Sequence, residues 1–282
     1  MKVVAVVVAL MLTVLVGCSQ PEPPRCVRYG LRADDPRANP EPLLDASGEP
    51  GAGVHLNQRF DSDRTSSRYH LFTRGIDWDR PVGLLVHLHG DGAEEFDEPE
   101  GVTACLAAVA ASHNLVLVVP HTPDWRGDVT WWQRMRRNRE WLTSLLQDEI
   151  LVDYDIDRTN IWWMGYSGGA EMITYGILPE ALDQVTGGAI MIGGGGAPSE
   201  MRSAPTPEQR ELVLHWATGL RDVGADPREP FNALEAARQG SEWYREQGFL
   251  RVSTEFPKSD DHFSIPQARI LADVLRDARV GE

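Results

Sequence analysis

Short apolar runs alternate along the chain with longer segments that have helical periodicity. Near-continuous apolar runs are typical of parallel strands that are covered on both faces. We expect such strands at 84–89, 115–119, 161–164, 189–192, 211–216 and 250–256. Helices are expected between them, near 101–113, 138–152, 168–178, 232–247 and 265–279. The alternation predicts an α/β fold, with a mostly parallel central sheet and helices on both faces.

Two further features belong to the predicted fold. The segments 54–60 and 68–74 precede the alternating series and are expected to form an antiparallel pair at its edge. The connection 193–210 is short, so no large lid domain is expected.

The N-terminus has the pattern of an export signal. Lys2 is followed by an apolar run over 3–16, which is shorter than the about 18–20 residues of a membrane-spanning helix. The run ends in the sequence LVGC, which resembles the bacterial lipobox, where a signal peptidase cuts before a lipid-modified cysteine. We therefore expect a lipoprotein signal peptide at 1–17, a lipid on Cys18, and a membrane-anchored location outside the cytoplasm. The alternative is a plain signal peptide or a short anchor helix in which Cys18 has no role.

The segment that follows is rich in proline. Residues 18–53 carry few apolar side chains, so they are not expected to bury a core and are predicted to form a lipid-anchored tether. The remaining length, 54–282, suits one α/β domain.

Charge and cysteine content narrow the function. Asp and Glu outnumber Lys and Arg by 42 to 27, which argues against a nucleic-acid partner because phosphate binding needs clustered cations. With Cys18 assigned to a lipid, Cys26 and Cys105 remain, and an oxidising compartment would allow them to pair. Cys105 lies in an apolar Ala/Val segment, which slightly favours a buried free thiol.

A candidate nucleophile lies where a predicted strand meets a predicted helix. The sequence GYSGG at 165–169 has the G-x-S-x-G pattern of a nucleophile elbow, in which the serine sits on a strained strand-to-helix turn. The strand before it and the helix-compatible segment after it are the context that this motif requires. Ser167 is therefore the predicted nucleophile.

The loop after the strand 84–89 is the candidate oxyanion hole. In the fold that carries this motif, one main-chain N–H comes from such a loop and another from the residue after the nucleophile. We assign these donors to Asp91 and Gly168, and we expect the Asp91 carboxylate to point away from the developing charge. The competing interpretation is a metal site at His87, His89 and Asp91, but the matching metal-binding signature continues with a histidine, and Gly92 stands there.

The expected chain order of the other two groups is acid, then histidine. His262 follows the last predicted strand and is the predicted base, whereas its rival His215 lies inside a predicted strand. Asp222 follows the strand before that and is the predicted acid. Asp226 is the alternative, as a residue of the same loop that precedes Pro227.

These residues resemble a known family. The stretch 154–169, with YDID followed by NIWWMGYSGG, is similar to the secreted α/β-hydrolase esterases grouped with polyhydroxybutyrate depolymerases and feruloyl esterases. The resemblance implies an ester hydrolase in which Ser167, Asp222 and His262 act together through an acyl-enzyme. The acidic stretch 94–100 and the tryptophan-rich loop 125–132 depart from the family, and they leave the substrate open.

The loop tryptophans are candidates for substrate binding. Trp125, Trp131 and Trp132 follow the strand 115–119, and Trp131 and Trp132 are assigned to the wall of an ester site; core packing is the equally weighted alternative. The overall prediction is a serine esterase of the cell envelope that needs no metal or organic cofactor and acts on a small-molecule or polymer ester. The alternatives are acyl transfer or peptide hydrolysis by the same three residues, and a non-catalytic envelope-binding lipoprotein.

Overall fold

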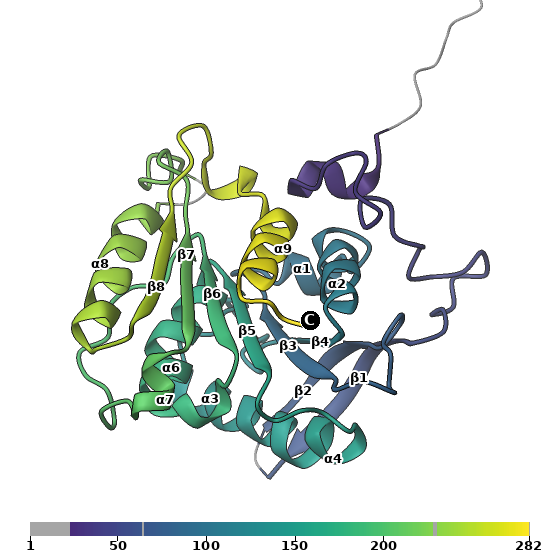
Figure 1. Cartoon of the computed structure of the whole chain (residues 1–282), viewed down its shortest axis with the longest axis horizontal. Coiled ribbons are helices and arrows are strands. Elements are labelled where there is room, and N and C mark those ends of the chain that lie inside the picture. Colours follow the sequence, from purple (N-terminus) through teal and green to yellow (C-terminus); the bar gives the residue numbers. More distant parts are fainter. Residues whose placement is uncertain (1–22, 64, 228–229, 282) are drawn as a thin grey trace, which may run out of the picture.

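The central sheet has eight strands in the order β1-β2-β4-β3-β5-β6-β7-β8 (Figure 1). It is seen in a computed structural model that describes residues 23–63, 65–227 and 230–281. The strands are β1 (Val54–Ser62), β2 (Thr65–Phe72), β3 (Gly83–Leu88), β4 (Leu115–Pro120), β5 (Ile161–Tyr166), β6 (Gly188–Ile192), β7 (Val213–Ala217) and β8 (Arg251–Glu255). The six strands from β3 to β8 are all parallel to one another. At the edge of the sheet, β1 pairs with β2 and β2 pairs with β4, and both of these pairs are antiparallel. The predicted mostly parallel sheet and its antiparallel edge are confirmed.

The apolar strands are buried on both faces because successive side chains enter two different cores. In β3, Leu84 and Val86 pack into one core while Leu85 packs into the other. In β5, Trp163 faces the first core and Trp162 the second. This two-sided burial explains why the sequence shows continuous apolar runs here instead of alternation.

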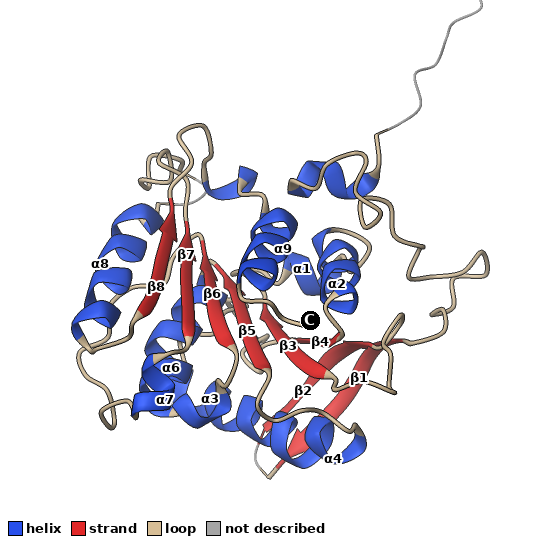
Figure 2. Cartoon of the chain, viewed as in Figure 1, coloured by secondary structure: helices blue, strands red, loops and turns tan. Residues whose placement is uncertain are grey.

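Helices cover both faces of the sheet (Figure 2). The longer ones are α2 (Val102–Ser112), α3 (Met135–Ser144), α8 (Ala233–Glu246) and α9 (Gln267–Asp277), and the shorter ones are α1 (Glu94–Asp97), α4 (Leu151–Asp153), α5 (Gly168–Met172), α6 (Leu178–Glu180) and α7 (Pro207–Arg210). π-helical turns at Leu145–Ile150 and Ile173–Ile177 continue α3 and α5. α2 and α9 contribute to one core, while α3, α5 and α8 contribute to the other. Between β6 and β7 the chain forms loops and the short α7, so no lid domain is inserted there.

The proline-rich N-terminal segment differs from the expected tether over the part that the structure describes. A 3₁₀ turn, Arg25–Tyr29, lies against α2 and α9, and Leu31 and Leu43 are buried in the core that these helices share (Figure 1). A disulfide joins Cys26 to Cys105 of α2, so the prediction of a free thiol is wrong. The few apolar residues of the segment are too irregularly spaced to predict this packing, because they extend a core built by other elements.

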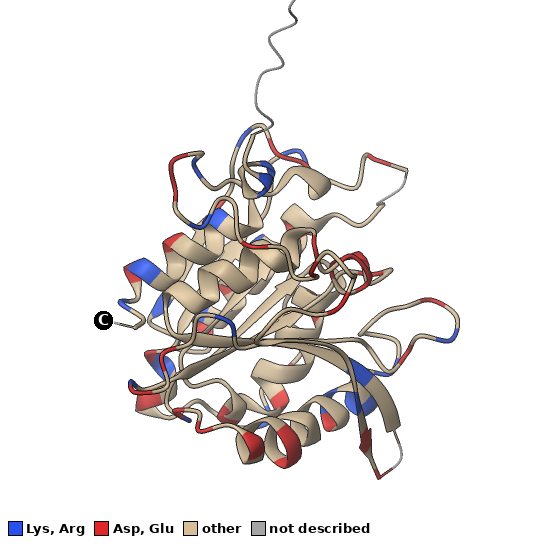
Figure 3. Ribbon diagram, turned by 90° about the vertical axis from the view of Figure 1, so that its right-hand side faces the viewer, with Lys and Arg blue, Asp and Glu red and all other residues tan. Residues whose placement is uncertain are grey.

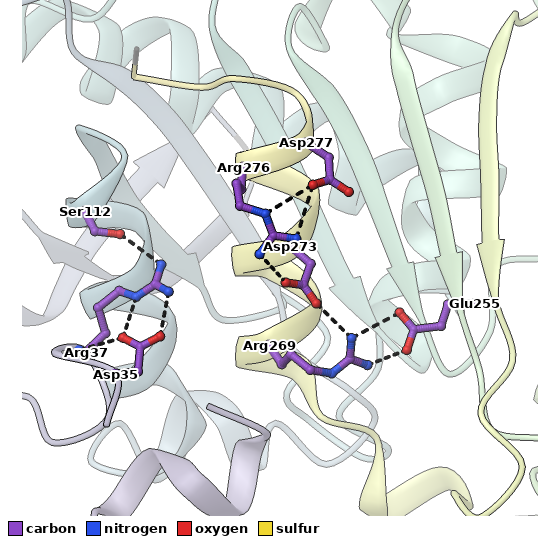
Figure 4. A network of polar contacts seen from close by, with 8 residues as sticks. All are labelled: Asp35, Arg37, Ser112, Glu255, Arg269, Asp273, Arg276 and Asp277. Atoms are coloured by element: carbon purple, nitrogen blue, oxygen red, sulfur yellow. Dashed lines mark hydrogen bonds and ion pairs between the residues drawn. The ribbon is translucent and has the colours of Figure 1, made fainter. Parts of the chain in front are cut away.

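Polar contacts fix two further parts of the same face (Figure 4). Arg37 forms an ion pair with Asp35 and reaches the Ser112 hydroxyl on α2. On α9, Arg269 pairs with Glu255 at the end of β8 and with Asp273 one turn along the helix. The N-terminal segment and the last helix are therefore both tied to the body of the domain.

The expected signal peptide and Cys18 lie outside the described residues. Within those residues, no helix combines the length and the apolar character that crossing a membrane requires.

Candidate active site

Ser167 occupies a strained turn between β5 and α5. Its backbone has φ 48° and ψ −116°, values that a residue with a side chain rarely adopts. Its N–H donates to the carbonyl of Ile192 on the neighbouring strand β6, at 2.8 Å. Strain of this kind persists only where the surroundings determine it, and it marks functional positions.

The glycines of the motif permit this turn because they let backbone segments approach closely. A Cβ on Gly165 would lie 2.4 Å from the carbonyl oxygen of Gly169. A Cβ on Gly169 would lie 2.2 Å from the carbonyl oxygen of Leu88, at the end of β3. A side chain at either position would therefore push the turn away from the sheet.

His262 and Asp222 meet at the same edge of the sheet. His262 begins a 3₁₀ turn, His262–Ser264, between β8 and α9, and Asp222 lies in the loop after β7. The Nδ1–H of His262 donates to Oδ2 of Asp222 at 2.8 Å, and both side chains are buried. This geometry leaves Nε2 as the ring nitrogen that can accept a proton. The structure gives this contact to Asp222, and it places the rival His215 in β7 against the Ser253 hydroxyl.

Tyr166, the variable residue before the serine, links the histidine to the nucleophile turn. Its hydroxyl donates to the carbonyl oxygen of His262 at 2.8 Å, and the two rings lie 5.1 Å apart. On the other side, a Cβ on Gly193 would lie 3.1 Å from Cε1 of His262. The sequence did not single out Tyr166, because the motif leaves this position open.

Four main-chain N–H groups belong to the nucleophile turn and to the loop after β3, and two of them already donate hydrogen bonds. The N–H of Gly90 donates to the buried Glu95 carboxylate at 3.0 Å, and the N–H of Gly92 donates to the Val129 carbonyl at 2.9 Å. The intervening N–H of Asp91 and the N–H of Gly168 have no hydrogen-bond partner within the part of the chain that the structure describes. These are the two donors that the sequence predicted.

Glu95 supports this loop and was not found by sequence reasoning. Burial raises the pKa of its carboxyl, and the hydrogen bond from Gly90 partly opposes that rise. The only sequence signal was its place in the acidic stretch 94–100, of which Glu95 and Phe96 are the buried residues.

The Asp91 side chain does not turn away from the site as expected. Its Oδ2 accepts from Trp132 Nε1 at 2.9 Å, and a Cβ on Gly168 would lie 2.2 Å from its Oδ1. The indole donor on the neighbouring loop therefore keeps the carboxylate beside α5.

A cavity of about 770 Å³ opens at Ser167. Trp132 lines it and is half exposed, as expected for a substrate wall. Trp131 is fully buried instead, with its Nε1 donating to the carbonyl of His89, so its assignment to substrate binding is wrong. The other walls come from α3, α5 and two loops and include Asp128, Val129, Thr130, Met135, Glu171, Tyr175, Pro230 and Phe231.

Glu171 links this cavity to the glycine-rich loop after β6. Its carboxylate accepts the N–H of Gly195 at 2.7 Å and the N–H of Gly196 at 3.3 Å. Burial raises the pKa of Glu171 above its ordinary value, while these two bonds act against the rise.

His89, one of the two histidines of the competing metal interpretation, forms hydrogen bonds to main-chain groups of the neighbouring loops. Nε2 of His89 accepts the N–H of Thr122 at 3.0 Å, so its Nδ1 carries the proton and donates to the Gly90 carbonyl. Burial lowers the pKa of His89 to about 3. In residues 23–63, 65–227 and 230–281, no group of three or more His, Cys, Asp or Glu side chains is arranged to hold a metal ion.

Comparison with known proteins shows similarity at the level of structure. No family model matches the chain, and no curated protein matches it either. A thermostable esterase superposes with a TM-score of 0.56 at 19% identity, over 84% of this chain and 68% of its own. A carboxylesterase from Bacillus cereus gives 0.57 at 19% identity, over 75% and 94%.

A feruloyl esterase module from Clostridium thermocellum, solved with sinapinate, gives a TM-score of 0.52 at 13% identity, over 86% of this chain and 94% of its own. At these identities the similarity concerns the arrangement of the backbone. Together with the eight-stranded, mostly parallel sheet, it shows that the chain has the α/β-hydrolase fold.

Proposed function

We propose that the protein hydrolyses carboxylic esters, with Ser167 as nucleophile, His262 as base and Asp222 as the group that orients the histidine. The observation that carries the proposal is the strained Ser167 turn at the mouth of a cavity, beside a buried His262–Asp222 pair. A strained serine, an oriented histidine and two unused N–H donors form the arrangement that acyl transfer to serine requires.

The reaction follows from these positions. Ser167 Oγ attacks the ester carbonyl carbon and gives its proton to His262 Nε2, while the N–H groups of Asp91 and Gly168 stabilise the oxyanion. The bond to the alcohol breaks as His262 returns the proton to the leaving oxygen, which leaves an acyl-serine. Water then attacks the acyl carbon, His262 takes its proton, and the acid departs as Ser167 regains its hydrogen.

The cavity favours an apolar or ring-bearing acyl group. Trp132, Tyr175 and Phe231 are partly exposed aromatic side chains that line it beside Met135. Exposed aromatic rings around a cavity supply contact area for a bound apolar group. A ring-bearing ligand also accompanies the feruloyl esterase module in its own structure.

The test is hydrolysis of p-nitrophenyl esters of graded acyl length by the purified protein. We expect turnover well above the Ser167→Ala background, with a preference for acyl groups that fill the cavity. Wild-type protein no faster than the variant on every ester would overturn the proposal.

We propose further that the protein is an exported lipoprotein, anchored through Cys18. The support is the lipobox-like sequence and the disulfide at Cys26, since disulfides persist in oxidising compartments. Replacement Cys18→Ser should move the protein out of the detergent phase or leave its signal uncleaved. An unchanged mass and unchanged partitioning would show that no lipid is attached there.

A further inference from the structure

A second cavity, of about 850 Å³, is distinct from the one at Ser167 and is lined by arginine. Five guanidinium groups contribute to its walls, from the antiparallel edge strands, the loop after β4 and the start of α3: Arg59, Arg68, Arg126, Arg134 and Arg137. Thr65 and Ser66 add hydroxyl groups, whereas the hydroxyl of Ser67 in the same wall already donates to the His121 carbonyl. These are the side-chain types that donate hydrogen bonds to oxyanions.

The concentration of positive charge is unusual for this chain. The whole sequence has 27 basic residues against 42 acidic ones, and its net charge is −15. Figure 3 marks these positions on the ribbon, with the acidic ones in red and the basic ones in blue. A protein of this charge repels anions in general, so a local basic cavity is needed for it to hold one.

A buried carboxylate arranges two of the arginines without neutralising the site. Asp124 accepts from Arg137 at 2.6 Å and lies 3.7 Å from Arg134, and it is the only carboxylate in the cavity wall as the structure describes it. Asn138 donates to its other oxygen at 3.0 Å. One negative charge is therefore shared by two guanidinium groups.

Two further arginines have no carboxylate partner in the described chain. Arg68 lies over the Phe96 ring and donates to the Asn57 amide oxygen at 3.1 Å. Arg126 lies over the ring of Trp125, 4.9 Å from its centroid. Stacking of this kind orients a guanidinium and leaves its N–H edge available.

The charges do not cancel. Arg59 pairs with Asp61, and Asp124 balances one of its two partners, so three of the five positive charges are left over. We propose that this cavity binds a multiply charged oxyanion, that is, a ligand presenting two or three carboxylate or phosphate groups. The proposal does not depend on ester hydrolysis.

The arginine cavity lies next to the serine cavity, because residues of one loop line both. Trp125 and Arg134 face the arginine cavity, while Trp132 and Met135 from the same stretch line the serine cavity. An anion bound to the arginines is therefore held next to the serine cavity, with one loop between them.

The test is calorimetric titration of the purified protein with citrate and with inorganic phosphate, at constant ionic strength set by chloride. The double variant Arg68→Gln/Arg126→Gln should weaken binding at least about tenfold, because it removes the two guanidinium groups without carboxylate partners. Arg126→Gln alone, which alters a side chain on an outer loop, should weaken it in the same direction.

The matched control is Arg136→Gln. Arg136 neighbours Arg137 on α3, is not among the residues that line the cavity, and pairs with Glu140. Its replacement removes one positive charge, as Arg126→Gln does, and binding should be unchanged. Sedimentation with vesicles of phosphatidylglycerol or phosphatidylcholine distinguishes a lipid headgroup from a free anion. Binding to none of these probes, binding that persists in the double variant of unchanged melting temperature, or an equal loss in Arg136→Gln would overturn the proposal.

Discussion

At the scale of single residues, the conformation of Ser167 is imposed by its neighbours. A Cβ on Gly165 would collide with the backbone of Gly169, and a Cβ on Gly169 would collide with the Leu88 carbonyl. The turn can therefore pack against β3 only because both residues are glycine. The strain at the serine is therefore maintained by packing of the sheet against α5.

The orienting acid is tested by a matched pair of substitutions in one loop. Asp222→Asn should lower ester turnover by on the order of 10⁴, because the imidazole then favours the wrong tautomer. Asp226→Asn should leave turnover close to wild type at saturating substrate. Steady-state rates of the two purified variants, together with their melting temperatures, measure this. The reverse order of activities would transfer the role to Asp226.

Sequence reasoning singled out Ser167, Asp222 and His262 from the motif and the chain order, and the structure pairs His262 with Asp222. The same reasoning assigned both Trp131 and Trp132 to the cavity wall, but these adjacent side chains point in different directions: Trp131 into the core and Trp132 to the cavity. The direction of a loop side chain depends on the course of the loop, which has no periodicity to read. Glu95 and Tyr166 were missed for a similar reason, since their roles lie in hydrogen bonds to main-chain groups.

At the scale of elements, the strands bury histidines that are held neutral. Burial lowers the pKa of His87 in β3 and of His70 in β2 to about 4, from an ordinary value of 6.5. The pKa of His89 falls to about 3 for the same reason. In the unfolded chain each of these rings takes up a proton near pH 6.5, whereas in the folded protein it does so only near pH 3–4.

The pH dependence of stability follows from the lowered pKa values of these three histidines. The stabilising contribution is present above pH 6.5 and is lost as the pH falls toward 4, at about 1.4 kcal/mol per unit of pKa shift for each histidine. The free energy of unfolding in urea should therefore fall by several kcal/mol between pH 6.5 and 4. His87→Leu should flatten the profile, and a variant with the wild-type slope would contradict this origin.

The strands were predictable because burial on both faces leaves continuous apolar runs. The helices were predictable between them, although the π-helical turns at Leu145–Ile150 and Ile173–Ile177 were not. A π-helical turn shifts the helical register by one residue, and such a small shift does not alter the apolar pattern visibly.

At the scale of the whole molecule, the described N-terminal segment belongs to the folded domain. The disulfide from Cys26 to Cys105 closes a loop across 79 positions, and Leu31 and Leu43 pack into the core that contains both cysteines. The sequence pattern did not predict this, because the residues of the segment that are buried, Cys26, Leu31, Ala38 and Leu43, have no periodic spacing.

The disulfide should contribute measurably to stability. Cys105→Ser combined with Cys26→Ser should lower the free energy of unfolding by about 2–5 kcal/mol, because the unfolded chain loses its cross-link. Denaturant titrations of the oxidised, reduced and double-variant forms measure this. Equal midpoints for all three forms would show that the disulfide contributes nothing to stability. The hydrolytic rate per folded molecule should be unchanged.

The central claim is that Ser167 is the nucleophile, and covalent labelling tests it most directly. A fluorophosphonate probe should react with the native wild-type protein, and mass spectrometry should place the adduct on the peptide that contains Ser167. Ser167→Ala should fold to the same melting temperature, take up no label and lose ester turnover by several orders of magnitude. Labelling that persists in the variant, or an adduct on another residue, would contradict the account.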